Sequence, residues 1–70
     1  MSTYAVVIEG TEGSYSAYVP DLPGCVAAGS SLEDVTSSIR AAIELHIQSL
    51  RAHGEPVPDP TTAVRLVDVA

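Results

Sequence analysis

The stretch that decides the fold runs over residues 31–54 and reads SLEDVTSSIRAAIELHIQSLRAHG. It opens with Ser31, a good N-cap, and Asp34 follows three positions later, where negative charge suits the positive end of a helix. Gly54, just after the basic Arg51, supplies a C-terminal stop. Between these ends, one side of a helix is marked out by apolar residues and a histidine at three- and four-residue steps: Leu32, Val35, Ile39, Ala42, Ile43, His46 and Leu50. The sequence therefore predicts one amphipathic helix of about 22 residues, or roughly 33 Å.

Three short runs before this helix are typical of β-strands. Residues 4–9 are rich in β-branched side chains, and residues 14–19 alternate small polar with apolar side chains. A turn over residues 10–13 carries two glycines and joins these runs as an antiparallel hairpin. Residues 25–28 predict a short third strand.

Two different segments follow the helix. Three prolines in alternate positions over residues 55–60 predict an extended connector, and residues 63–69 are expected to form a last strand. The predicted order is β-β-β-α-β, an α+β fold in which a single sheet carries one long helix on one face. Seventy residues leave room for one such domain, residues 1–70.

The first strand is apolar on both of its faces. Tyr4, Val6 and Ile8 alternate with Ala5 and Val7. An exposed antiparallel strand is normally polar on one side. One helix can cover one face, so the other face is expected to be covered by a second protomer or by a partner protein.

Charge and composition narrow the classes of partner. Nine acidic residues, three arginines and no lysine give a net charge of −6, which argues against direct nucleic-acid binding. An acidic surface is compatible with a basic protein partner, although solubility alone explains this charge better. No apolar run approaches the roughly 18 residues of a membrane span, and the first residues do not resemble a signal peptide. With a single cysteine, the chain is expected to be cytoplasmic.

The residues that could carry catalysis do not form a recognisable set. Cys25 has His46 and His53 as possible co-ligands, at spacings that do not match a zinc site. His46 lies on the apolar side of the helix and is expected to pack there rather than to act as a base. The carboxylates are scattered over turns, loops and the helix surface, unlike a metal cage. No catalytic, cofactor-binding or metal-binding residue is predicted, and the chain is expected not to be an enzyme.

The loop over residues 18–25, YVPDLPGC, is unusually stiff. Pro20 and Pro23 fix two φ angles within four residues. Such a loop loses little entropy on binding and would suit the presentation of Asp21 and Leu22 to a partner. A stiff connector without any partner explains the same residues equally well.

The segment YSAYVPDLPGC, residues 15–25, resembles the signature of HicB-type antitoxins. The resemblance extends to residues 4–9, 29–34, 41–45 and 54–58, and so covers most of the chain. It implies a partial, degraded ribonuclease-H-like fold that lacks the catalytic acids. It also implies a homodimer or homotetramer that neutralises a small basic HicA-type toxin, an RNA-cleaving protein.

This resemblance leads to a hypothesis for the site, in which the chain covers the active surface of the toxin with a set of contact residues: Tyr18, Pro20, Asp21, Leu22, Pro23 and Glu44. Many such antitoxins continue into a C-terminal DNA-binding domain, which this chain is not expected to have, so operator binding is not carried over. An alternative is an orphan HicB-like structural or regulatory dimer module without a toxin. Residual metal-dependent nuclease activity is a third hypothesis.

Overall fold

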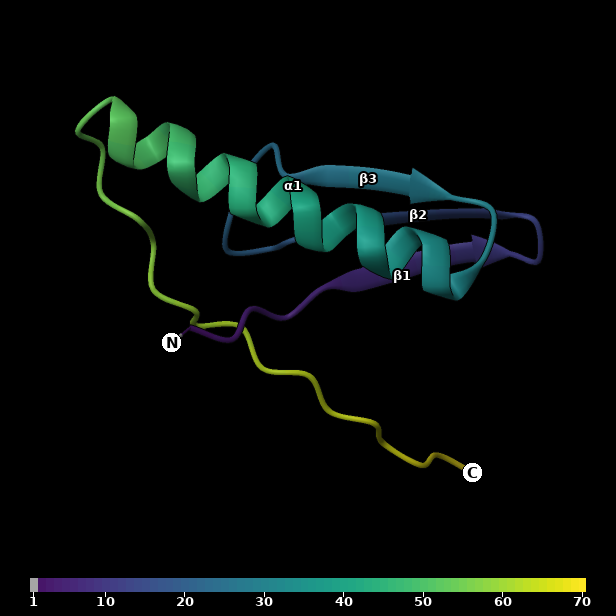
Figure 1. Cartoon of the computed structure of the whole chain (residues 1–70). Coiled ribbons are helices and arrows are strands. Elements are labelled where there is room, and N and C mark those ends of the chain that lie inside the picture. The colour runs from purple at the N-terminus through teal and green to yellow at the C-terminus, as the bar shows by residue number, and fades with distance from the viewer. Residues whose placement is uncertain (1) are drawn as a thin grey trace.

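Three antiparallel strands form one sheet, and a long helix lies across one of its faces (Figure 1). The structure, a computed structural model, describes residues 2–70. The strands are β1 (Val7–Thr11), β2 (Ser14–Tyr18) and β3 (Val26–Gly29), in the order β1-β2-β3, and the helix is α1 (Leu32–Ala52). The predicted α+β class, the hairpin and the helix are confirmed, although β1 begins at Val7 rather than at residue 4 and extends through Gly10 and Thr11. The likeness to ribonuclease H stays a prediction.

Both ends of α1 are closed by the groups that the sequence predicts. The Ser31 hydroxyl oxygen accepts a hydrogen bond from the backbone N–H of Asp34 at 3.0 Å, and the Ser30 hydroxyl donates to the Asp34 carboxylate at 2.6 Å. At the other end Gly54 has a φ of 69°, and its N–H donates to the carbonyl of Arg51 at 3.1 Å. The Ser31 and Gly54 contacts satisfy backbone groups that a helix end otherwise leaves unpaired, and the Ser30 contact holds the Asp34 side chain in place.

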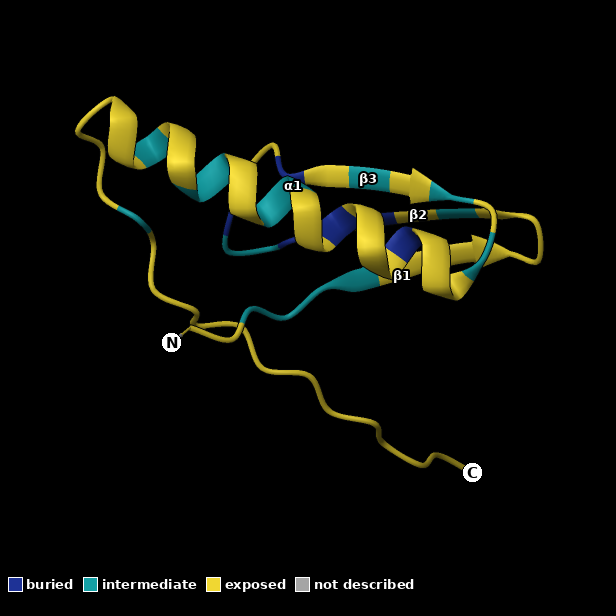
Figure 2. Ribbon diagram, viewed as in Figure 1, coloured by how far each residue is buried: buried dark blue, intermediate teal, exposed yellow. Residues whose placement is uncertain are grey.

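The core lies between α1 and the inner face of the sheet (Figure 2). α1 packs over β2 and β3 rather than over β1. A close approach at Gly29 allows this, because a Cβ there would come within 2.5 Å of the backbone nitrogen of Val35. The buried side chains are small in number for a domain of this length: Ala17, Val19, Leu22, Cys25, Val35 and Ile39.

The outer face of the sheet carries an apolar row, here called the outer row, made of the half-buried Val7 and the exposed Tyr18 and Val26. The strand register pairs Tyr18 with both of the others, so the three side chains lie side by side across the sheet. Tyr18 is 43% exposed and Val26 64%. The helix thus leaves this row open, mainly at Tyr18 and Val26, and the prediction that a second protein covers the outer face stays a prediction.

The prediction of a strand over residues 63–69 is wrong for the isolated chain. This segment, here called the tail, is extended but pairs with no strand within the described residues, and it runs away from the domain (Figure 1). An extended segment becomes a strand only when a neighbouring strand satisfies its backbone groups, and the tail has no such neighbour here. Its large apolar side chains are therefore exposed: Val64 65%, Leu66 98%, Val67 74% and Val69 89%.

Ile39→Ala is expected to lower the free energy of unfolding by about 2–4 kcal/mol, because it leaves a cavity in a fully packed position. Ile39 is 3% exposed, whereas Leu45 on the same helix is 65% exposed. The control Leu45→Ala should change stability by less than about 0.5 kcal/mol. Urea denaturation monitored by circular dichroism measures both variants, and equal losses would contradict this position of the core.

Candidate functional site

The loop that joins β2 to β3 is folded back on itself. The N–H of Val19 donates to the carbonyl of Cys25 at 3.1 Å, and the N–H of Cys25 donates to the carbonyl of Leu22 at 3.0 Å. This closed loop turns the side chain of Leu22 into the core, where it is 0% exposed. The expectation that Leu22 is presented to a partner is therefore wrong, because its side chain fills the space under the helix.

Asp21 is also engaged within the chain. Its carboxylate accepts hydrogen bonds from the backbone N–H and the hydroxyl of Thr61 at 3.1 and 3.0 Å, and from the same two groups of Thr62 at 3.0 and 2.8 Å. Donation by the Thr62 backbone N–H is the main reason why the pKa of Asp21 lies below its ordinary value, with the other three hydrogen bonds acting in the same direction and desolvation opposing them. Asp21 thus ties the connector to the loop, an arrangement here called the Asp21 clasp.

The other predicted contact residues lie on two different surfaces. Tyr18 points to the outer face of the sheet, opposite to the buried Ala17 that precedes it. Pro23 is exposed at the tip of the loop, while Pro20 is half-buried beside it. Glu44 is exposed on α1, which covers the inner face. The structure does not bring the six residues together in a single site.

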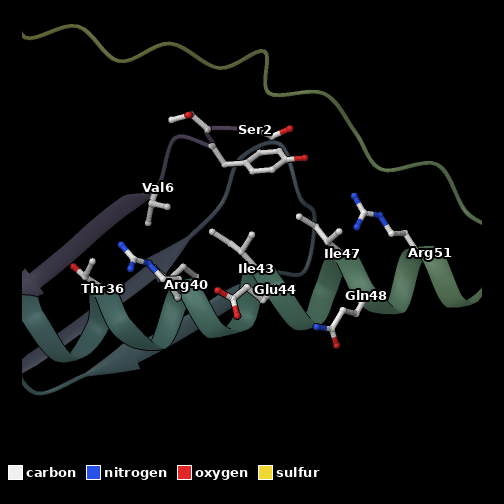
Figure 3. A pocket seen from close by; sticks show the side chains of 12 residues that line it. Ser2, Val6, Thr36, Arg40, Ile43, Glu44, Ile47, Gln48 and Arg51 are labelled. Carbon is white, nitrogen blue, oxygen red and sulfur yellow. The ribbon is translucent and has the colours of Figure 1, made fainter.

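A groove of about 840 Å³ runs between α1 and the segment that leads into β1 (Figure 3). Its floor is apolar: Tyr4, Val6, Ile39, Ile43 and Ile47. In Figure 3, Val6 points down towards the helix and Ile43 and Ile47 point up towards the segment of β1. The helix adds polar side chains along the rim: Thr36, Arg40, Glu44, Gln48 and Arg51. Residues 2–6, which border this groove, lead into β1, and β1 is an edge strand of the sheet with β2 as its neighbour.

The sequence carries no local signal for the hydrogen-bond partners of Asp21 or for the groove, and neither is predicted from it. Thr61 and Thr62 are 40 and 41 residues from Asp21 along the chain, and no local spacing relates them to it. The burial of Leu22 did have a signal, since Val19, Leu22 and Cys25 are apolar at every third position of a tight loop. That periodicity favours an inward-facing side chain over a displayed one.

The structure adds little that would support catalysis. Among residues 2–70, no three His, Cys, Asp or Glu side chains lie close enough together to hold a metal ion. Cys25 is buried, and this burial raises the pKa of its thiol, which disfavours the reactive thiolate. His46 is half-buried on α1. In the same part of the chain, no helix is long and apolar enough to cross a membrane.

The fold and these surfaces define a small α+β domain with an outer row and a groove that are both apolar and accessible. The chain belongs to the HicB-like antitoxin family of bacterial toxin-antitoxin systems, whose sequence model matches residues 4–69.

Individual relatives agree with this family. A UPF0150 protein of Synechocystis is 37% identical over 67 residues, which cover 94% of this chain and 85% of that protein. A UPF0150 protein of Helicobacter pylori is 48% identical over 46 residues, 66% of this chain and 64% of the relative. Among solved structures, a chain of a HicA3 and HicB3 toxin-antitoxin complex matches with a TM-score of 0.72 and 32% identity, over 86% of this chain and 70% of that one.

Leu22→Asp is expected to unfold much of the protein, because a carboxylate would be placed in the core without a partner. Pro23→Asp, at the exposed neighbouring position, is the matched control and should keep the melting temperature within a few degrees of the wild type. Thermal melts followed by circular dichroism compare the two. A folded Leu22→Asp variant with unchanged stability would contradict the inward orientation of this side chain.

Acid is expected to open the Asp21 clasp. Because the pKa of Asp21 is lowered in the folded chain, the clasp contributes stability above the ordinary carboxyl pKa of about 3.9 and loses it as the pH falls through the lowered value. Backbone ¹⁵N relaxation should therefore show Thr61 and Thr62 ordered at pH 7 and at pH 4, and mobile only once the pH has fallen below the lowered pKa of Asp21. Asp21→Asn should make both residues mobile already at pH 7, whereas Asp59→Asn, in the same connector, should leave them ordered.

Proposed function

We propose that this chain is an antitoxin that neutralises a small basic HicA-type toxin by covering the active surface of that toxin. The family match and the likeness to a chain of a HicA3 and HicB3 complex support a toxin as the partner. The single observation that carries the proposal on this chain is the outer row, an apolar strip on a sheet face that the helix leaves open.

The chemistry of the outer row suits a protein partner. Tyrosine is among the residues that contribute most at protein interfaces, and Tyr18 lies at the centre of the row. Glu9 lies on the same face, since it pairs with Ser16 two positions along the strands from the outer row. With a net charge of −6, the chain would attract a basic RNA-binding surface and orient it before contact.

This proposal changes the set of contact residues. It keeps Tyr18 and Pro23 and adds Val7 and Val26. Leu22 is withdrawn because it is buried. Asp21 and Pro20 shape the loop rather than touch the toxin, since the Asp21 carboxylate is occupied by the connector.

Glu44 is assigned to the rim of the groove, which lies on the opposite side of the sheet from Tyr18. In this proposal it makes no contact with the toxin. We further infer that the protein acts in the cytoplasm, by binding rather than catalysis, and without direct contact to nucleic acid.

The alternative is an orphan HicB-like structural or regulatory dimer module that serves no toxin. The observation that favours it is the amount of apolar surface suited to self-association, in the groove and in the tail. The two functions differ in one respect that can be measured. An antitoxin needs the outer row to protect cells, and an orphan module does not.

Val26→Asp is expected to abolish protection of cells from a co-expressed small basic protein encoded beside this chain, because it places a charge in the outer row. Leu45→Asp makes the same kind of change on an exposed helix position outside the outer row and the groove, and should preserve protection. Growth assays and co-purification measure the effect. Equal protection by both variants would exclude the outer row, and a wild-type chain that neither binds nor protects would favour the orphan module.

A further inference from the structure

The groove between α1 and residues 2–6 is open along the line on which a fourth strand would continue the sheet past β1. β1 is at the edge of the sheet, so one side of its backbone is not paired within the sheet. Above that edge, α1 presents Ile43 and Ile47 to an open space rather than to a fourth strand. A strand added here would run alongside residues 2–6 and the start of β1, and would cover the apolar floor of the groove at the same time.

The tail has the dimensions of such a strand. From Thr36 to Arg51, the groove extends over fifteen helical steps, or roughly 22 Å. The tail, residues 63–69, spans roughly 23 Å when extended. It is the part of the described chain with the most exposed large apolar side chains, and Leu66 is 98% exposed.

Charge favours one direction for the added strand. α1 follows β3 and runs back over the sheet in the direction opposite to β1, so its C-terminal end lies on the side from which residues 2–6 lead into β1 (Figure 1). A tail lying parallel to β1 would therefore enter the groove near Arg51. With about 3.3 Å per strand residue and 1.5 Å per helix residue, Leu66 would then lie near Ile43, and Asp68 near Arg40. Leu66 and Asp68 are on the same face of a strand, so both would point into the groove.

The tail is held away from the groove of its own chain. The Asp21 clasp fixes Thr61 and Thr62, and the hydroxyl of Tyr4 donates a 2.6 Å hydrogen bond to the carbonyl of Pro58. Prolines at positions 56, 58 and 60 stiffen the same connector. These contacts direct the tail outward, where it can reach a second molecule (Figure 1).

We propose that two copies of this chain exchange their tails, each tail extending the sheet of the other copy by lying in the groove, parallel to residues 2–6 and the start of β1. The arrangement is symmetric, since each copy contributes one tail and one groove. In it Leu66 packs on Ile43, and Asp68 pairs with Arg40 of the other copy. The face of the tail opposite to Leu66, which includes Val67 and Val69, widens the outer face of the sheet.

Leu66→Asp tests the apolar part of this interface. Sedimentation velocity and multi-angle light scattering at micromolar concentrations should give a dimer for the wild type and a folded monomer for Leu66→Asp. The matched control Leu45→Asp also puts a charge on an exposed leucine, and should stay dimeric. A monomeric wild type, or a dimer that survives Leu66→Asp, would overturn the proposal.

Two charge reversals test whether the tail binds in exchange. Arg40→Asp and Asp68→Arg should each weaken the homodimer about tenfold, since each dimer loses two ion pairs worth a few-fold apiece. Mixed in equal amounts, the two variants should form a heterodimer of wild-type affinity. In this heterodimer, the tail of the Arg40→Asp variant keeps Asp68 and enters a groove that keeps Arg40. The tail of the Asp68→Arg variant carries a positive charge and enters the groove of the Arg40→Asp variant, which carries a negative charge. Both grooves therefore receive a tail of opposite charge.

Native mass spectrometry of the mixture distinguishes the possible occupants of the groove. Preferential heterodimer formation supports exchange. If the tail folded back into the groove of its own chain, each variant would remain impaired and mixing would restore nothing. If a toxin filled the groove instead, the reversals would abolish toxin binding and leave the mass of the free chain unchanged. Either of these last two results would overturn the proposal.

Discussion

A single helix can cover one face of a sheet, and this constraint governs the rest of the molecule. α1 covers the inner faces of β2 and β3, where the core residues Val35 and Ile39 are buried. The edge of β1 and the outer row then remain open to solvent. A domain of 70 residues gains limited stability from its own core, so apolar surface left open in this way favours association with another polypeptide.

The loop between β2 and β3 stabilises the fold, although its sequence suggests a binding loop. Its prolines and glycine suggest a binding loop, yet Leu22 closes the core and Asp21 holds the connector. One short segment thereby links the sheet, the space under the helix and the start of the tail. A change in this loop would therefore act at a distance, through the direction in which the tail leaves the domain.

The elements that the sequence predicts well are those whose signals are local. Ser31, Asp34 and Gly54 define the ends of α1 from their own side chains and conformations, and the structure places them as expected. The tail was predicted as a strand from an equally local pattern, but a strand also needs a neighbour, and no pattern in one chain specifies whether that neighbour lies in the same molecule. The Asp21 clasp joins residues forty positions apart and was missed for the same reason.

The two exposed apolar surfaces are assigned to different partners. In our proposals, the groove binds the tail of a second copy, and the outer row binds the toxin. Association of the chain with a second copy is tested best by the molar mass of the purified wild-type protein in solution, determined by sedimentation equilibrium over a wide concentration range. We expect a mass at least twice that of the 7.2 kDa chain, falling towards one chain only on dilution. A single species of 7.2 kDa at all concentrations would contradict it.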